Sequence, residues 1–191
     1  MYQDFLKQYQ AELIAHINAI DADSIQAFVE AFAEAYRHDK QIFVIGNGGS
    51  AATANHFACD FGKNAVQGER RRFRILSLSS SVETITALGN DISFDEIFRQ
   101  QLINLMNPGD LVLAISASGN SPDIIKAVEY AKARQGKVLG LAGFKGGKLS
   151  ELADISMVAH MNSYERVEDI HLIILHIIIC FLKEHQEMLV G

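Results

Sequence analysis

Five short apolar runs, separated by segments with helical spacing, constrain the fold of this chain more than any other feature. They read IFVIG at 42–46, FRILSL at 73–78, LVLAIS at 111–116, KVLGLAG at 137–143 and ISMVA at 155–159. Most are too continuously apolar to leave one face in water, which is typical of parallel strands covered on both sides. The alternation predicts a three-layer α/β/α domain around a five-stranded parallel sheet, with ligands bound at the carboxyl ends of the strands.

The segments on either side of this core are expected to be helical. Residues 1–40 show helical spacing twice, first around Phe5 and Tyr9 and then around Phe28 and Phe32, with the turn-forming DADS between them at 21–24. This pattern predicts an N-terminal helical hairpin. Residues 161–191 are expected to form a long C-terminal helix, so that the 191 residues make one domain with its α/β core at 41–160.

The most apolar stretch is IHLIILHIIICFL at 170–182, which at thirteen residues with two histidines is shorter than a membrane span. We expect a helix that is buried on nearly every side, partly by another subunit. Cys59 and Cys180 lie in apolar helical surroundings without a CxxC pattern, which predicts buried thiols in a reducing compartment. The N-terminus is polar and unlike a signal peptide, so we expect a cytoplasmic protein. A net charge of −6 argues against direct binding of nucleic acid and favours a small ligand.

Two strand-to-helix junctions carry residues suited to a phosphate. The first is GNGGSA at 46–51, and the second is SASGNS at 116–121. Each offers glycine, free backbone N–H groups at a helix start, and hydroxyl groups. Alternatively, each junction is an ordinary strand-to-helix turn with a serine cap and binds no ligand. GNGGSA also fits the loose dinucleotide fingerprint, but the second apolar run ends in serines rather than in the required acidic residue, so no nucleotide cofactor is expected.

Taken together, the motifs resemble those of the sugar isomerase (SIS) domain family. They are GNGGSA with the following His56 and Phe57, GND at 89–91, ISASGNS at 115–121 and ERVEDIHLIILH at 165–176. The resemblance spans nearly the whole chain and is greatest to members that interconvert sedoheptulose 7-phosphate and D-glycero-D-manno-heptose 7-phosphate. It implies an aldose–ketose isomerase that acts through an enediol intermediate, as a homotetramer.

The resemblance also implies roles for individual residues. The family's acid and base correspond to Asp60 and His176, and some members hold zinc at positions matching His56, Asp60, Glu168 and His176. Asp60 stands where the family has glutamate, and Glu168 where it has glutamine. The expected substrate-binding residues are Asn47, Gly48, Gly49, Ser50, Asp91, Ser116, Ser118, Ser121, Glu165 and Glu168.

The residue types themselves suit this chemistry. An enediol mechanism needs a base for the carbon acid and a second group for the oxygens, which a carboxylate and a histidine supply. His56 and Asp60, at i and i+4, project from one helix face and could instead bind a divalent ion or simply each other. Eight residues separate Glu168 from His176 by about 12 Å of helix, so one ion receives both only at full reach or from two subunits. His171 is expected to be a core or interface histidine.

A non-catalytic regulator is the other functional class to consider. Some SIS-domain proteins are similar in sequence but act through protein partners, as the DnaA initiator-associating protein does. Fold alone does not decide between the two. Loss of the carboxylate or of the C-terminal histidine would favour the regulator, but Asp60 and His176 are both present. The sequence therefore favours an enzyme that binds a phosphorylated sugar.

Overall fold

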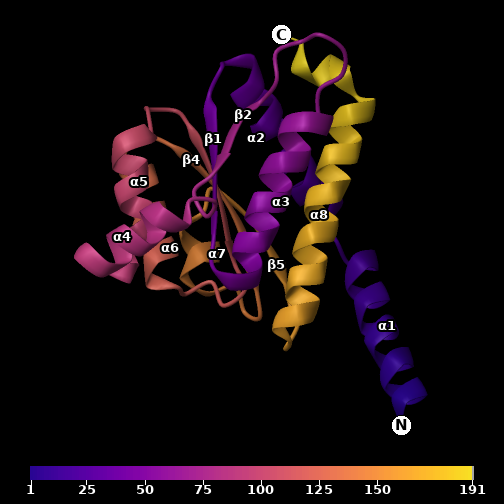
Figure 1. Ribbon diagram of the computed structural model, residues 1–191. Helices are drawn as coiled ribbons and strands as arrows, with labels where there is room; N and C mark the ends of the chain where they lie inside the picture. Colours follow the sequence, from indigo (N-terminus) through magenta and orange to yellow (C-terminus); the bar gives the residue numbers. More distant parts are fainter. Residues whose placement is uncertain (191) are drawn as a thin grey trace.

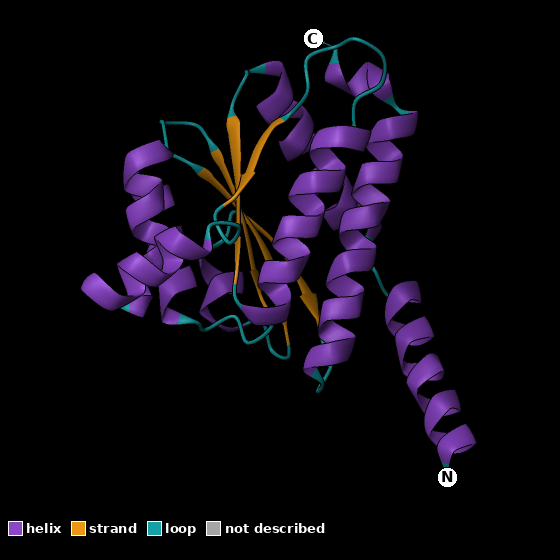
Figure 2. Cartoon of the chain, viewed as in Figure 1, coloured by secondary structure: helices purple, strands orange, loops and turns teal. Residues whose placement is uncertain are grey.

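The structure of the chain is a computed structural model that describes residues 1–190. Its centre is a parallel sheet of five strands in the order β2-β1-β3-β4-β5, seen between helices in Figure 2. The strands are β1 (Gln41–Gly46), β2 (Arg74–Ser77), β3 (Leu111–Ser116), β4 (Lys137–Gly143) and β5 (Ile155–Ala159). Four of the five apolar runs contain one strand each, and the fifth, at 42–46, covers all of β1 except its first residue, so the predicted parallel sheet is confirmed.

Helices cover both faces of the sheet. Alternate side chains of a strand point to opposite faces, so Ile42 and Val44 of β1 belong to one hydrophobic core and Phe43 and Ile45 to the other. The first core is closed by α2 (Ala22–Arg37), α3 (Gly48–Asn64) and α8 (Tyr164–Glu184). The second is closed by α4 (Val82–Asp91), α5 (Ile97–Leu105), α6 (Pro122–Ala133) and α7 (Gly147–Leu152). The predicted three-layer α/β/α architecture is therefore confirmed.

The strand order fixes where a ligand can bind. From β1 the chain crosses to β2 at one edge, then returns past β1 to β3 on its other side. The connections after β1 and β3 thus leave toward opposite faces of the sheet and open a crevice between them. GNGGSA follows β1 and SASGNS follows β3, so both predicted phosphate loops lie at this crevice.

The two N-terminal helices form a more open pair than a closed hairpin. Figure 1 shows α1 (Tyr2–Asn18) projecting beyond the rest of the chain, with the N-terminus at its free end. It buries no residue, whereas α2 buries Phe28 and Phe32 in the core. Its tertiary bonds go to α8, where the Tyr9 hydroxyl donates to Asp169 Oδ2 at 2.7 Å, and to the segment after β5, where His16 lies against the carbonyl oxygen of His160. The apolar side chains of α1 find little to pack against within one copy of the chain, which explains the open arrangement.

The C-terminal helix is less enclosed within one copy than its sequence suggests. Helix α8 buries one stripe, including Val167, Ile174 and Ile178, against the sheet, α3 and α2. Ile177 and Phe181 on the remaining surface are each 38% exposed. Cys180 and, on α3, Cys59 are also exposed, so the expectation of buried thiols is wrong for the single chain. The reason is geometric, because a sheet and two helices cover only one side of a helix that is apolar all round. No helix within residues 1–190 is long and apolar enough to cross a membrane.

His171 is a core histidine, as the sequence predicts. It is 1% exposed, and its Nε2 lies 2.9 Å from the carbonyl oxygen of Ala142 in β4. Burial lowers the pKa of this imidazole to about 4, although the bond to Ala142 acts in the opposite direction. The folded chain therefore keeps His171 neutral at pH values where an exposed histidine is charged.

This buried histidine should make the protein sensitive to mild acid. Because the unfolded chain binds a proton at a pKa near 6.5 and the folded chain does so near 4, stability falls as the pH drops through this window. We expect His171 to account for a loss of about 2 kcal/mol between about pH 7.5 and about pH 5. Urea denaturation at both pH values would measure it, with His171→Leu as the comparison. An equal loss in the variant would assign the acid sensitivity to other groups.

Candidate active site

The loop after β1 leaves the first turn of α3 accessible to a ligand. Gly48 has φ +54, a conformation that side chains rarely adopt, and it begins the helix directly after the N-cap residue Asn47. The Asn47 side chain makes no capping hydrogen bond to its own helix. The first backbone N–H groups of α3 thus have no acceptor within the helix, and the Asn47 side chain does not supply one either. They are available to an anion, as an anion-binding site requires.

The loop after β3 gathers hydroxyl groups at the start of α6. Ser116 Oγ and Ser121 Oγ lie 3.4 Å apart, and Ser118 Oγ accepts a hydrogen bond from the backbone N–H of Asn120 at 3.2 Å. Ser121 is the N-cap of α6, yet its side chain does not cap the helix. The hydroxyl groups and the helix start therefore lie together in one place, where they can hold the oxygens of a phosphate.

These two loops and the first turns of α8 enclose a small pocket of about 170 Å³. It is lined by Asn47, Ser50, Ile115, Ser116, Ala117, Ser118, Ser121, Tyr164 and Glu168. Six of these residues are expected substrate-binding residues, which the fold brings together from three separate segments of the sequence. Its size and its ring of hydroxyls suit a phosphoryl group better than an apolar ligand.

Glu168 joins this pocket because Gly49 leaves room for it. A Cβ atom at position 49 would lie 2.2 Å from the Glu168 carboxylate, so this carboxylate occupies space that a side chain at position 49 would fill. Burial raises the pKa of Glu168, and the negative charges of Glu165 and Asp169 add to the effect. Glu165 itself is exposed, and a hydrogen bond from Ser163 Oγ at 2.6 Å lowers its pKa. Only Glu168 of the two acidic residues lines the pocket.

Farther along the same two helices lies a cluster of potential metal ligands. His56 and Asp60 project from α3 and His176 from α8, two helices that contact each other side by side in Figure 1. His56 Nε2 lies 2.9 Å from His176 Nε2 and 3.5 Å from Asp60 Oδ2. One nitrogen or oxygen from each of the three residues falls within 4.8 Å of the others. Two imidazoles and a carboxylate at this spacing fit a divalent ion such as zinc.

Glu168 is not part of this cluster, although it belonged to the expected set of four ligands. Eight residues of α8 separate it from His176, which places them about 12 Å apart along the helix axis. Asp91 is also remote from both groups of residues. It ends α4 on the other side of the sheet, where its Oδ1 accepts a hydrogen bond from Asn90 Nδ2 at 2.8 Å. Within one copy of the chain, Glu168 thus belongs with the serine pocket and Asp91 with neither group.

Two residues near the pocket carry no recognisable sequence signal. Tyr164 lines it from the first turn of α8, with its ring packed against Phe144 at 4.9 Å between centroids. Asp123, directly after Pro122, reads as an ordinary acidic residue in the first turn of a helix. The structure instead buries it to 1% exposure and places it 2.7 Å from Asn47.

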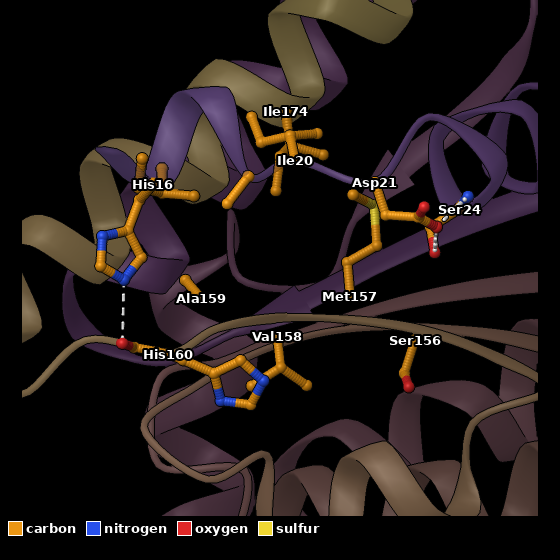
Figure 3. Close-up of a pocket in the computed structure, with 12 residues that line it drawn as sticks. His16, Ile20, Asp21, Ser24, Ser156, Met157, Val158, Ala159, His160 and Ile174 are labelled. Atoms are coloured by element: carbon orange, nitrogen blue, oxygen red, sulfur yellow. Dashed lines mark hydrogen bonds between the residues drawn. The ribbon is translucent and has the colours of Figure 1, made fainter. Parts of the chain in front are cut away.

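A second cavity, of about 430 Å³, lies between the start of α2 and β5. Figure 3 shows Met157, Val158 and Ile174 among the side chains that line it. His16 lies at its side, with Nε2 2.9 Å from the carbonyl oxygen of His160. This cavity is larger than the serine pocket, but its walls are mostly apolar. No residue of the loops at 46–51 and 116–121 lines it. We therefore place the candidate active site at the serine pocket and the adjoining cluster.

The hydroxyls of the serine loop should carry much of the affinity for phosphate. Replacing Ser118 and Ser121 together with alanine is expected to weaken binding of a sugar phosphate at least about tenfold, because each hydrogen bond to a charged group contributes about 1.5 to 3 kcal/mol. Isothermal titration of the double variant against the unmodified protein would measure this. Unchanged affinity would move the phosphate to another part of the chain.

Comparison with known proteins agrees with this geometry. The sequence profile of the SIS domain matches residues 4–143. Phosphoheptose isomerases from Geobacter sp. (strain M21) and Pelobacter propionicus are 34% and 40% identical, over 97% and 91% of this chain and 99% and 89% of their own lengths. The solved structure of phosphoheptose isomerase GmhA from Neisseria gonorrhoeae superimposes with a TM-score of 0.88 at 28% identity, covering 96% of this chain and all of the other. This chain belongs to the SIS domain family.

Proposed function

We propose that this chain is an isomerase that converts sedoheptulose 7-phosphate to D-glycero-D-manno-heptose 7-phosphate. The observation that carries the proposal is the placement of a serine-lined phosphate pocket and a His/Asp/His cluster along the same pair of helices, α3 and α8. The relatives named above, similar over nearly their whole length, are phosphoheptose isomerases. An aldose–ketose isomerase belongs to the intramolecular oxidoreductases, since it moves hydrogen between neighbouring carbons of one molecule.

The spacing of the two parts supports a ligand with a phosphate at one end and a carbonyl group at the other. Position 168 lines the pocket and position 176 belongs to the cluster, about 12 Å farther along α8. A sugar phosphate held by Ser116, Ser118 and Ser121 must therefore extend several carbons to reach the cluster. A seven-carbon chain phosphorylated at its far end has this form.

In this proposal Asp60 and His176 transfer the protons. One of them removes a proton from C1 of the ketose, which gives an enediol, and then delivers a proton to C2 after exchange with solvent. The other serves the oxygens of C1 and C2, whose protons must move in step with the carbon acid. We assign the carbon proton to the Asp60 carboxylate and the oxygens to the His176 imidazole. Asn47, Ser50 and Glu168 lie along the path of the carbon chain and supply contacts to its hydroxyl groups.

The same cluster supports zinc as a cofactor. His56, Asp60 and His176 would supply two nitrogens and one oxygen, which are ligands that zinc accepts. Zinc bound there would engage the His176 nitrogen that faces the cluster, so the ion would replace this imidazole in polarising the oxygens at C1 and C2. The second oxygen of the Asp60 carboxylate would remain available for the carbon proton. Glu168 would join this set only if another subunit brought it closer. Elemental analysis of the purified protein, compared with His56→Ala, tests this part of the proposal.

We further propose that the active form is a homotetramer. Helix α1 exposes Phe5, Leu6 and Ile14 to between 44% and 59%, and α8 exposes Ile177 and Phe181. Such a surface is unusual on a monomer and suits burial against further copies. Light scattering at micromolar concentration that found a stable monomer would remove this part of the proposal. The cytoplasmic location expected from the sequence also stays a prediction.

An isomerisation assay against a panel of ketose phosphates tests the proposed function. Sedoheptulose 7-phosphate should be the best substrate, and a chelator should abolish turnover if zinc takes part. Turnover of a different ketose phosphate would keep the isomerase and change its substrate. Binding of these compounds without turnover of any would favour a regulator that senses sugar phosphates.

A further inference from the structure

Asp123 is a buried carboxylate that has no part in the mechanism above. It is the second residue of α6 and is 1% exposed, and its Oδ2 accepts a hydrogen bond from Asn47 Nδ2 at 2.7 Å. Desolvation raises the pKa of Asp123, while hydrogen bonds from Asn47 and from the backbone of Ile124 lower it. Since Asn47 precedes α3 and Asp123 begins α6, this bond joins the two loops that form the pocket.

The bond also decides which end of the Asn47 amide is available to a ligand. A carboxylate accepts hydrogen bonds but cannot donate them, so the amide nitrogen must face Asp123. Asn47 lines the pocket, and no hydrogen bond to its Oδ1 is present among residues 1–190. The group left for a ligand is therefore the carbonyl oxygen Oδ1, which is an acceptor. It cannot bind a fully ionised phosphate, which has no hydrogen to donate, but it can accept a hydrogen bond from a hydroxyl group.

We propose that Asp123 is a positioning residue that turns the Asn47 carbonyl oxygen toward a hydroxyl group on the carbon chain of the substrate. The inference rests on the proposed function and identifies how the site distinguishes a polyhydroxy phosphate from phosphate itself. The negative charge of Asp123 in the first turn of α6 opposes anion binding at that helix start. Asp123 thus contributes to selectivity for the sugar rather than to affinity for the phosphate.

The variant Asp123→Asn separates these two effects. It preserves shape, removes the charge, and introduces an amide that can either accept from Asn47 Nδ2 or donate to Asn47 Oδ1, so the orientation of the Asn47 side chain is no longer fixed. Affinity for inorganic phosphate should stay equal or increase, whereas affinity for sedoheptulose 7-phosphate should fall severalfold, because the Asn47 carbonyl oxygen then faces the ligand only part of the time. The ratio of the two dissociation constants, measured by titration, does not depend on turnover.

Two further variants serve as controls. The exchange Asn47→Asp with Asp123→Asn reverses the hydrogen bond between the two positions but still presents a carboxylate oxygen, an acceptor, to the ligand from position 47. It should therefore recover both the melting temperature and the selectivity. Asp110→Asn changes another buried carboxylate, which accepts backbone hydrogen bonds from Gln41 and Asn107 at the opposite end of β3. It should lower the melting temperature and leave the ratio unchanged.

The proposal fails if Asp123→Asn weakens both ligands by the same factor, because Asp123 would then only support the loop. It also fails if the exchange recovers stability but not selectivity, since an acceptor at position 47 would then not be the group that selects the sugar. If Asp123→Asn does not fold, the exchange variant alone decides between these outcomes. Failure of the proposed isomerase is a separate result, because it requires absence of turnover by the unmodified protein.

Discussion

Asp60→Asn is expected to lower the rate of isomerisation on the order of 10³-fold, the contribution that a positioned acid or base commonly makes. The amide has nearly the shape of the carboxylate but cannot take a proton from carbon. The serine pocket, which Ser50 lines from the same helix, lies about three helical turns away, so binding of a sugar phosphate should change little. Steady-state kinetics should therefore show a loss in kcat with a nearly constant dissociation constant for the substrate.

Two companion variants refine this prediction. His176→Gln should behave like Asp60→Asn, because both remove a proton-transferring group from the same cluster. Asp60→Glu introduces the residue that the resemblance to the family implies at this position, and should raise activity if the shorter side chain is a handicap. If the site is adjusted to the shorter side chain, activity and bound zinc should fall together. Normal turnover in both Asp60→Asn and His176→Gln would contradict the assigned roles.

Gly119→Ala is expected to weaken binding of sugar phosphates about a hundredfold, since displacement of the loop removes several hydrogen bonds to a charged group at once. Gly119 has φ +65, and a Cβ atom there would lie 1.9 Å from the backbone oxygen of Gly146. A hydrogen bond also holds the serine loop at Gly119, where the N–H of Leu149 donates to the Gly119 carbonyl oxygen at 2.9 Å. The added methyl group cannot be accommodated by a side-chain movement, so the serine loop itself must shift.

Gly68→Ala is the matched control for this effect. Gly68 has a similar φ of +69, but a Cβ atom there would meet nothing within 4 Å, and the residue lies in the loop before β2. Both variants carry backbone strain, and only Gly119→Ala adds a clash beside the serines. Titration with a sugar phosphate and thermal denaturation would separate strain from displacement. Equal losses of affinity in the two variants would show that the contacts of Gly119 with Gly146 and Leu149 do not position the serine loop.

The parts of the fold that follow from local chemistry were predictable from the sequence. Each strand coincides with an apolar run, and the loops at 46–51 and 116–121 fall at the crevice that parallel topology creates. The openness of α1 was not predictable, because apolar spacing shows which face of a helix will be buried but not what will bury it. The exposure of Cys59 and Cys180 has the same origin.

The sequence predicted which residues form the candidate site better than it predicted how they are arranged in space. The motifs led to six of the side chains that line the pocket, but not to Tyr164, and to the three that cluster as potential ligands. The separation of Glu168 from that cluster follows from helix length, which the spacing already indicated. Asp123 could not be found, because its role depends on a contact with Asn47 across 76 positions of sequence.

The most direct test of the central claim is to incubate the protein with sedoheptulose 7-phosphate in deuterium oxide and follow the sugar by nuclear magnetic resonance. Proton transfer through an enediol predicts a new aldose 7-phosphate that carries deuterium at C2, and none in the Asp60→Asn variant. An unmodified protein that binds the sugar phosphate but yields neither product nor exchange of the C1 proton would contradict the account and leave a sugar-phosphate sensor in its place.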